Sequence, residues 1–124
     1  MQPGKKILLV EDEPEFRVAL RMRLEANGYD IIEAEDGAIG LDAVRHQNPD
    51  LIILDVRLPG MDGFKLARLL KFDVKYKNIP LMMLTVMSQA SDRKMGQAVG
   101  ADAYLTKPYQ PQELLDTISI LISR

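Results

Sequence analysis

The sequence predicts an α/β fold in which a five-stranded parallel sheet carries helices on both faces. Two observations support this fold class. Short runs of apolar residues alternate along the chain with segments whose apolar residues recur at the helical period. The connections between successive apolar runs are too long for hairpins and long enough for the helical crossovers that join parallel strands. Such alternation, repeated five times in 124 residues, is typical of a doubly wound sheet.

The expected strands are the apolar runs at residues 5–10, 29–34, 51–55, 81–85 and 103–106. The third run is the most apolar, with LIIL directly before Asp55, and it predicts a strand buried on both faces. The second is interrupted by Asp30 and Glu33, which indicates a less buried strand. For five β-α units of this length we expect the flavodoxin-like strand order 2-1-3-4-5.

The expected helices occupy residues 14–26, 38–47, 64–72, 92–99 and a last segment that begins at Pro111. Pro14 and Pro111 suit the first turn of a helix, where a missing N–H has no intrahelical partner in any case. Ala19 and Ala38 fall on the predicted inward faces of the first two helices. The expected packing residues of the weakly apolar fourth helix are Met95, Ala98 and Val99.

The composition is that of an ordinary globular domain, with 47% hydrophobic residues, 27% charged residues and a formal net charge of −2. No basic run suggests a nucleic-acid surface. Cysteine is absent, which excludes disulfides and thiolate metal sites, and the single His46 is expected on the surface. The sequence shows neither a signal peptide nor an apolar run of the ~20 residues needed to cross a membrane. We therefore expect one cytoplasmic domain over residues 1–124.

Polar residues stand at the carboxyl ends of four expected strands: Glu11 and Asp12, then Asp55, Thr85 and Lys107. In the order 2-1-3-4-5 these strands are neighbours, so the five side chains should share a cleft at the edge where open α/β sheets bind ligands. Three carboxylates repel one another unless a cation lies among them, and oxygen ligands select a hard divalent ion such as Mg²⁺. An Asp beside such an ion and an ammonium group is suited to attack phosphorus and form an acyl phosphate.

Each of these residues also has an ordinary explanation when it is taken alone. An acidic pair after a strand is more often a solvated helix start, favoured by the helix dipole. Thr85 alone would more often be a strand-end or capping hydroxyl, and Lys107 alone a surface lysine. The shared position of all five residues, at one end of neighbouring strands, favours the common site.

Four motifs lie in order at these strand ends: ILLVEDE (7–13), LIILDVRLPGMDG (51–63), LMMLT (81–85) and GADAYLTKP (100–108). With these motifs the chain resembles, over its whole length, the receiver domains of bacterial two-component response regulators, which have the chemotaxis-regulator type of fold. The resemblance implies that Asp55 is the phosphoacceptor and that Thr85 and Lys107 bind the phosphoryl group. The ligands implied for Mg²⁺ (or Mn²⁺) are Glu11, Asp12, Asp55 and the backbone carbonyl of Arg57.

The resemblance also implies roles for residues around this site. Tyr104 would be an aromatic switch that turns inward when Thr85 is drawn towards the phosphoryl group. The Lys107-Pro108 peptide is expected to be cis. The residues that border the site, where they would tune access to Asp55 and the lifetime of the acyl phosphate, are Arg57, Val86 and Met87.

The implied function is a phosphorylation-dependent signalling switch, not a turnover enzyme. A sensor histidine kinase or phosphotransfer protein would supply the phosphoryl group. The surface of the fourth helix, fifth strand and fifth helix would then change its affinity for a downstream effector protein or output domain, and no output domain is expected within this chain. Asp102-Ala103 stands where the winged-helix subfamily carries an Asp-Asp pair, which argues against that subfamily's charge-latched dimer. We expect a monomer or a weak dimer, with no direct binding of nucleic acid or membrane.

Three alternatives differ from this reading. One is a receiver-like interaction module that is never phosphorylated, and the β-branched Val86 after Thr85 keeps it open. Another is an Asp-nucleophile phosphatase, but that class resembles a DxD pattern and here Arg57 stands in place of the second Asp, so the proton-transfer group is missing. A flavin-binding flavodoxin would need a hydroxyl- and glycine-rich phosphate loop after the first strand, which this sequence lacks.

Overall fold

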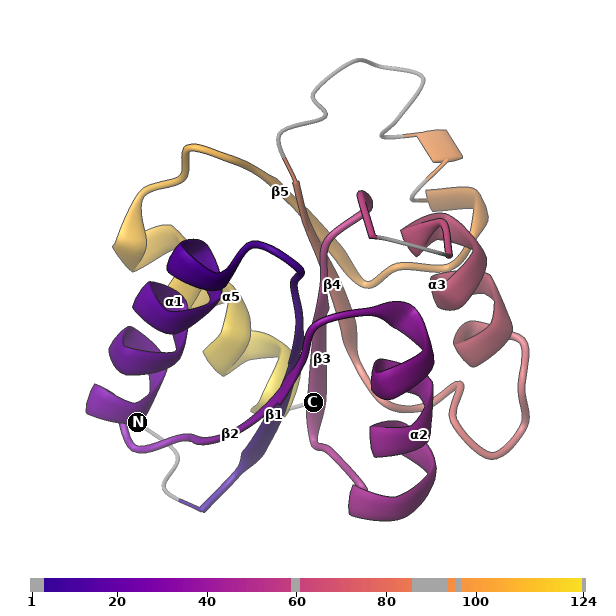
Figure 1. Ribbon diagram of the computed structural model, residues 1–124, viewed down its shortest axis with the longest axis horizontal. Helices are drawn as coiled ribbons and strands as arrows, with labels where there is room; N and C mark the ends of the chain where they lie inside the picture. Colours follow the sequence, from indigo (N-terminus) through magenta and orange to yellow (C-terminus); the bar gives the residue numbers. More distant parts are fainter. Residues whose placement is uncertain (1–3, 59–60, 86–93, 96, 124) are drawn as a thin grey trace.

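Five parallel strands form one sheet in the order β2-β1-β3-β4-β5, as the sequence predicts (Figure 1). The computed structural model describes residues 4–58, 61–85, 94–95 and 97–123. The strands are β1 (Lys6–Val10), β2 (Asp30–Ala34), β3 (Leu51–Leu54), β4 (Leu81–Thr85) and β5 (Ala103–Thr106). All four residues of β3 are buried, because this strand is central and is covered on both faces.

The register of the central strands brings their carboxyl ends level. Val10 pairs with Leu54 in the β1–β3 ladder, and the Asp55 N–H donates to the Val10 carbonyl at 3.1 Å. On the other side of β1, the Glu11 N–H donates to the Ala34 carbonyl at 3.0 Å. Glu11 and Asp55 therefore leave the sheet from neighbouring backbone positions that the ladder holds rigidly.

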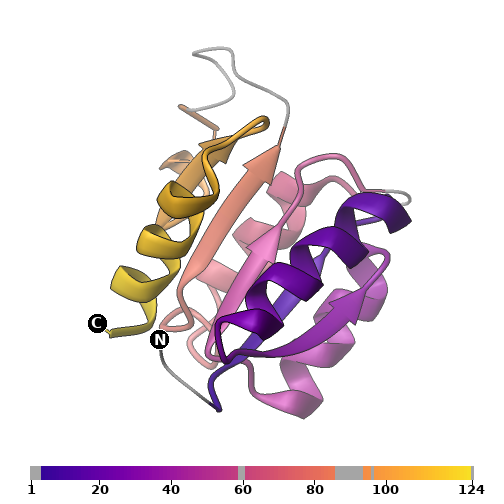
Figure 2. The ribbon, with the colours of Figure 1, turned by 90° about the vertical axis from the view of Figure 1, so that its left-hand side faces the viewer.

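Four labelled helices cover the two faces of the sheet: α1 (Pro14–Ala26), α2 (Gly37–Gln47), α3 (Gly63–Lys71) and α5 (Pro111–Ser123). Figure 1 shows α1 and α5 on one face and α2 and α3 on the other. In Figure 2 the strands run behind α1 and α5. None of the helices in the described part of the chain has the length and apolarity required to span a bilayer.

Two apolar cores result, one on each side of the sheet, because successive strand side chains point to opposite faces. In β1, Ile7 and Leu9 pack with the α1 and α5 side, whereas Leu8 and Val10 pack with the α2 and α3 side. Each core also takes alternate residues of β3 and β4. The buried helical residues are Leu20 and Leu24 of α1, Ala43 and Val44 of α2, Leu66, Ala67 and Leu70 of α3, and Leu114, Ile118 and Leu121 of α5.

Two predicted inward residues are exposed. Ala19 and Ala38 both face solvent. The buried residues of α2 are Gly37, Gly40, Ala43 and Val44, and of the two glycines it is Gly40 that faces β1. A Cβ on Gly40 would lie 3.0 Å from the Val10 Cγ2, so the helix approaches β1 through a residue without a side chain. Periodicity over apolar side chains could not detect a packing face built on glycine.

The fourth predicted helix, at 92–99, falls partly outside the described residues. Lys94, Met95, Gln97 and Ala98 are helical. Of its three expected packing residues only Val99, in the following turn, is buried, whereas Met95 is 49% exposed and Ala98 is also exposed. The weak apolar pattern therefore corresponds to a segment with little packing, and the expectation for Met95 and Ala98 was wrong.

An ion pair joins several elements at the amino-terminal edge of the sheet. The Lys71 Nζ, at the end of α3, donates to the Asp102 Oδ2 at 2.9 Å and to the carbonyls of Lys77 and Ile79. Asp102 Oδ2 also accepts the Leu81 N–H at 2.9 Å. The Lys71 side chain is 10% exposed and that of Asp102 19%. This clamp ties α3 and the polar connection after it to the starts of β4 and β5.

Candidate functional site

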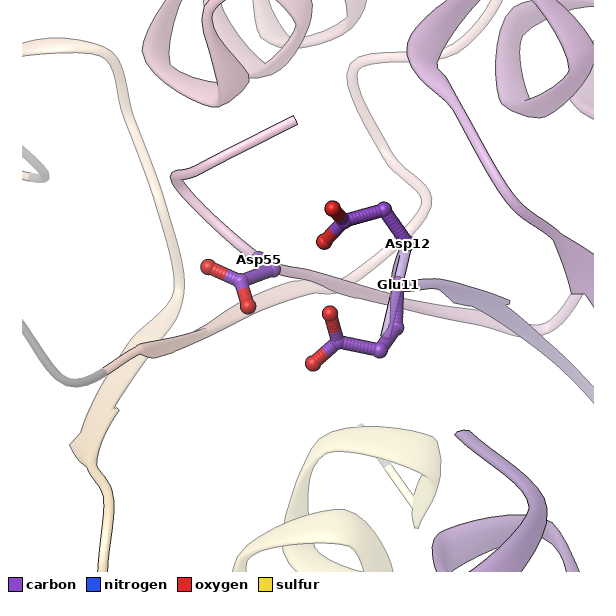
Figure 3. A group of neighbouring side chains, drawn as sticks. All are labelled: Glu11, Asp12 and Asp55. Atoms are coloured by element: carbon purple, nitrogen blue, oxygen red, sulfur yellow. The ribbon is translucent and has the colours of Figure 1, made fainter. Parts of the chain in front are cut away.

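Three carboxylates gather at the carboxyl edge of the sheet. Glu11 and Asp12 follow β1 and Asp55 follows β3, and Figure 3 shows their side chains reaching into the same space. One carboxylate oxygen from each lies within 4.8 Å of the others. Glu11 and Asp55 are buried, at 2% and 7% exposure, whereas Asp12 is exposed. The cluster therefore has a solvent-facing acid and two acids set into the protein.

Lys107, which follows β5, reaches back across the sheet edge to this cluster. Its Nζ donates to the Glu11 Oε1 at 2.6 Å and to the Asp55 Oδ2 at 3.0 Å. The Lys107 side chain is only 11% exposed, so these contacts replace most of its hydration. The sequence predicts Glu11, Asp12, Asp55 and Lys107 in one cleft, and the structure brings them together.

The backbone of the loop after β3 supports Asp55 from the other side. The Arg57 N–H donates to the Asp55 Oδ1 at 2.9 Å, so each carboxylate oxygen of Asp55 has a hydrogen-bond partner. Asp62 caps α3 by accepting the Phe64 N–H, and the Gly63 N–H donates to the Val56 carbonyl at 2.8 Å. These contacts join the first turn of α3 to the peptide that carries Asp55.

Gly63 is a site residue whose role the sequence analysis did not identify. A Cβ at this position would lie 2.6 Å from the Val56 Cα and 2.7 Å from the Val56 carbonyl oxygen, and it would also meet the Asp55 carbonyl. Only glycine lets the two backbones approach so closely. The sequence signal was a glycine eight residues after the acid, but a glycine in a turn does not reveal which backbone it contacts.

An aromatic pair lies beside Lys107, and the sequence analysis missed it as well. The Lys107 Nζ lies 3.7 Å from the centroid of the Phe16 ring, a cation–π distance. Tyr109 meets Phe16 edge to face, with ring centroids 6.3 Å apart and an interplanar angle of 86°. In sequence, Phe16 was assigned only to the apolar stripe of the first helix. The available signal was an aromatic residue one helical turn after the acidic pair.

Burial and neighbouring charges shift the pKa values of Glu11 and Lys107. Burial raises the pKa of Glu11 to about 7, although the hydrogen bond from Lys107 opposes this shift. Burial by itself would lower the pKa of Lys107, but its hydrogen bonds to Glu11 and Asp55 outweigh that effect and raise it above the usual value. Lys107 therefore stays charged at neutral pH, whereas Glu11 titrates near neutrality in the metal-free protein.

The remaining predicted site residues belong to β4, to β5 or to the residues that follow these strands in the chain. Thr85 ends β4, beside β5 in the sheet, but its side chain and the residues Val86 and Met87 lie outside the described part of the structure. Tyr104 lies on β5, is half-buried and packs against the core on the α2 and α3 side. The Lys107-Pro108 peptide is cis, as expected.

The donor set fits a divalent cation. Three carboxylates and one ammonium leave an excess of negative charge in a partly buried space, which a hard cation would neutralise. The carboxylate oxygens lie close enough together to share one ion. Mg²⁺ is satisfied by a few carboxylates plus waters, and the exposed Asp12 leaves a solvent side for those waters.

The fold and these residues agree with a comparison against protein families. The model of the response regulator receiver domain matches residues 7–119. The chain belongs to the response regulator receiver domain family. Proteins of this family act in two-component phosphorelay signalling, in which receiver domains interact with histidine kinases and downstream effectors. They are regulators, not turnover enzymes.

Individual relatives show the same likeness. The phosphate regulon transcriptional regulatory protein PhoB of Pseudomonas aeruginosa is 40% identical over 121 residues, which are 98% of this chain and 53% of PhoB. The chain thus spans about half the length of this and similar curated relatives.

Two solved structures of receiver proteins are similar to this chain in fold, and one of them contains a magnesium ion. The chemotaxis response regulator CheY4 of Vibrio cholerae is 33% identical with a TM-score of 0.87, covering 94% of this chain and 98% of that one. The receiver domain of sensor histidine kinase PA1611 from Pseudomonas aeruginosa is 30% identical with a TM-score of 0.90, covering 98% and 99%. That receiver domain was solved with a magnesium ion coordinated in its active-site cleft.

Proposed function

We propose that residues 1–124 form a single receiver domain that switches state when Asp55 accepts a phosphoryl group from the phosphohistidine of a kinase or phosphotransfer protein. The observation that carries this proposal is the position of Asp55. It is buried at the end of the central strand, hydrogen-bonded through both oxygens, and in contact with Lys107. A carboxylate held in this way beside a cationic group is preorganised as a nucleophile.

The transfer is an in-line displacement. A carboxylate oxygen of Asp55 attacks phosphorus, a P–O bond forms, and the P–N bond of the donor breaks, its electron pair staying on the histidine nitrogen. Lys107 compensates the negative charge on the phosphoryl oxygens. A Mg²⁺ or Mn²⁺ ion bound by Glu11, Asp12, Asp55 and the Arg57 carbonyl supplies further charge compensation when present.

The readout follows from the new charge on Asp55. We propose that the Thr85 hydroxyl and the Lys107 ammonium move towards the phosphoryl group and that Tyr104 turns inward. The surface that includes β5 and α5 then changes its affinity for an effector protein or an output domain. Arg57, Val86 and Met87 tune access to Asp55 and the lifetime of the acyl phosphate. This is a two-state element biased by a modification.

The phosphatase alternative has less support. It needs a second acid two residues after the nucleophile to protonate the leaving group, and Arg57 stands there. The Arg57 N–H holds the Asp55 carboxylate in place, a contact that a switch and an enzyme would both use.

The proposal is tested by phosphorylating the protein with small donors. The chain is incubated with Mg²⁺ and acetyl phosphate or phosphoramidate, and its intact mass is measured. We expect a gain of one phosphoryl group, lost in Asp55→Asn and retained in Asp42→Asn, which alters an exposed acid of α2. A wild-type protein that gains no mass from either donor or from a cognate kinase would be an interaction module. A gain that persists in Asp55→Asn would refute the assignment of the phosphoacceptor.

A further inference from the structure

The Lys107 ammonium contacts two kinds of group. It donates hydrogen bonds to the carboxylates of Glu11 and Asp55, at 2.6 and 3.0 Å. The Nζ also lies over the Phe16 ring, 3.7 Å from its centroid. Because the Lys107 side chain is 11% exposed, the ring occupies space in which water would otherwise hydrate the ammonium. An aromatic face is the one apolar surface that attracts a cation.

The Phe16 ring is itself held in a defined orientation. It lies in the first turn of α1, which begins with Pro14 just after the acidic pair. Tyr109, in the loop between β5 and α5, meets it edge to face at 86°. Phe16 also packs against the core on the α1 and α5 side. The ring therefore cannot turn its face away from Lys107 without disturbing two other contacts.

We propose that Phe16 is a positioning residue for phosphoryl transfer, whose ring face seats the Lys107 ammonium within hydrogen-bond reach of Asp55. This inference rests on the proposed function and deepens it. The ring makes no contact with the reacting atoms and acts through Lys107. Its effect is to keep the ammonium localised where negative charge develops, so that little reorganisation is needed during the reaction.

The sign of the effect follows from the geometry. The Nζ already lies 3.0 Å from the Asp55 Oδ2 in the unphosphorylated protein, so the seated position is close to the one it needs beside a phosphoryl group on Asp55. Weakening the contact between the Phe16 ring and the Lys107 ammonium should therefore slow phosphorylation of Asp55. For a cation–π contact in a mostly desolvated setting, complete loss corresponds to a rate decrease of about two- to thirtyfold.

The test replaces Phe16 with ring-fluorinated phenylalanines carrying one, two and three fluorines, incorporated at this position only. Fluorine withdraws electron density from the ring face and weakens cation–π attraction, with little change in ring shape. The rate of phosphorylation by acetyl phosphate is measured at saturating Mg²⁺, together with the free energy of unfolding. We expect the rate of the fully folded protein to fall stepwise with each fluorine, and the free energy of unfolding to fall by no more than the strength of the contact. A purely structural role would lower the free energy of unfolding without changing that rate.

Matched variants complete the design. The same fluorinated residues at Phe72, which is 65% exposed at the end of α3, should leave the rate unchanged. Phe16→Leu should slow the reaction, and Phe16→Tyr, which keeps an aromatic face, should restore most of it. If the wild-type protein is phosphorylated but the rate does not fall from one fluorinated protein to the next, this inference is overturned and the proposed function stands. A wild-type protein that takes no phosphoryl group overturns the proposed function itself.

Discussion

Replacing Gly63 with alanine should both destabilise the protein and misplace Asp55. Gly63 is the first residue of α3, and its N–H donates to the Val56 carbonyl at 2.8 Å. An alanine Cβ would lie 2.6 Å from the Val56 Cα and 2.7 Å from the Val56 oxygen, where ordinary contact begins at 3.4 Å. The atoms that it meets are backbone atoms of the peptide next to the phosphoacceptor, and they cannot move aside by changing rotamer.

The magnitude follows from that overlap. The start of α3 and the Asp55–Val56 backbone must separate by about 1 Å to restore normal contact. Such overpacking costs about 1–3 kcal/mol, and a weakened Gly63–Val56 hydrogen bond adds about 1 kcal/mol. The better helix propensity of alanine offsets about 0.5–1 kcal/mol. A net loss of about 1–3.5 kcal/mol is a large share of a typical domain's stability.

The matched control is Gly37→Ala, since Gly37 is likewise the first residue of a helix. Its added Cβ would lie 3.1 Å from the Cβ and Sδ of Met61, so this side chain has to give way by only a few tenths of an ångström, and Met61 is only partly buried. Urea unfolding should show a change within about 1 kcal/mol for Gly37→Ala, and phosphorylation by acetyl phosphate should be slowed tenfold or more only in Gly63→Ala. Equal stability of the two variants, with wild-type phosphorylation rates in both, would refute this reasoning.

Two further predictions concern ionised groups. Because the pKa of Glu11 rises from 4.5 to about 7 on folding, the folded state binds more protons than the unfolded chain between these values. Without divalent metal the free energy of unfolding should therefore fall by up to about 3 kcal/mol as pH rises through that window, at about 1.4 kcal/mol for each unit of the pKa difference. Urea unfolding at several pH values measures this slope, and an unchanged slope in Glu11→Gln would exclude Glu11 as its source. Lys71→Met should lower the free energy of unfolding by about 2–4 kcal/mol, because it leaves Asp102 and two carbonyls without their shared cation. Lys65→Met, on the exposed face of the same helix, should change it by less than about 0.5 kcal/mol, and equal effects of the two substitutions would contradict the clamp.

Much of the fold and of the site could be predicted because the informative signals are local. A run such as LIIL can be buried on both faces only in a central strand, and parallel connections bring the ends of such strands to one edge. Glu11, Asp12, Asp55 and Lys107 are therefore neighbours for a topological reason, and the structure brings them together. The predicted strand order holds for the same reason.

The errors concern packing faces. Periodicity placed Ala19 and Ala38 inward, but both are exposed, since a small side chain adds little to the choice of a buried face. In α2 two of the buried positions are glycines, Gly37 against Met61 and Gly40 against Val10 of β1, and a glycine carries no apolar signal. The polar connection after α3 likewise gave no sign that Lys71 would satisfy two of its carbonyls.

Residue types and their spacing along the chain were enough to predict the strand order and the acidic edge, both of which the structure confirms, and they led to the proposal that Asp55 accepts the phosphoryl group. Tertiary structure alone decided what surrounds those residues. It placed the ring of Phe16 against the Lys107 ammonium and the first turn of α3 against the Asp55 backbone. The physical reason is that burial and strand direction depend on residue type and spacing along the chain. Contacts between a ring and an ammonium 91 positions away, or between two backbones, depend on how separate elements dock.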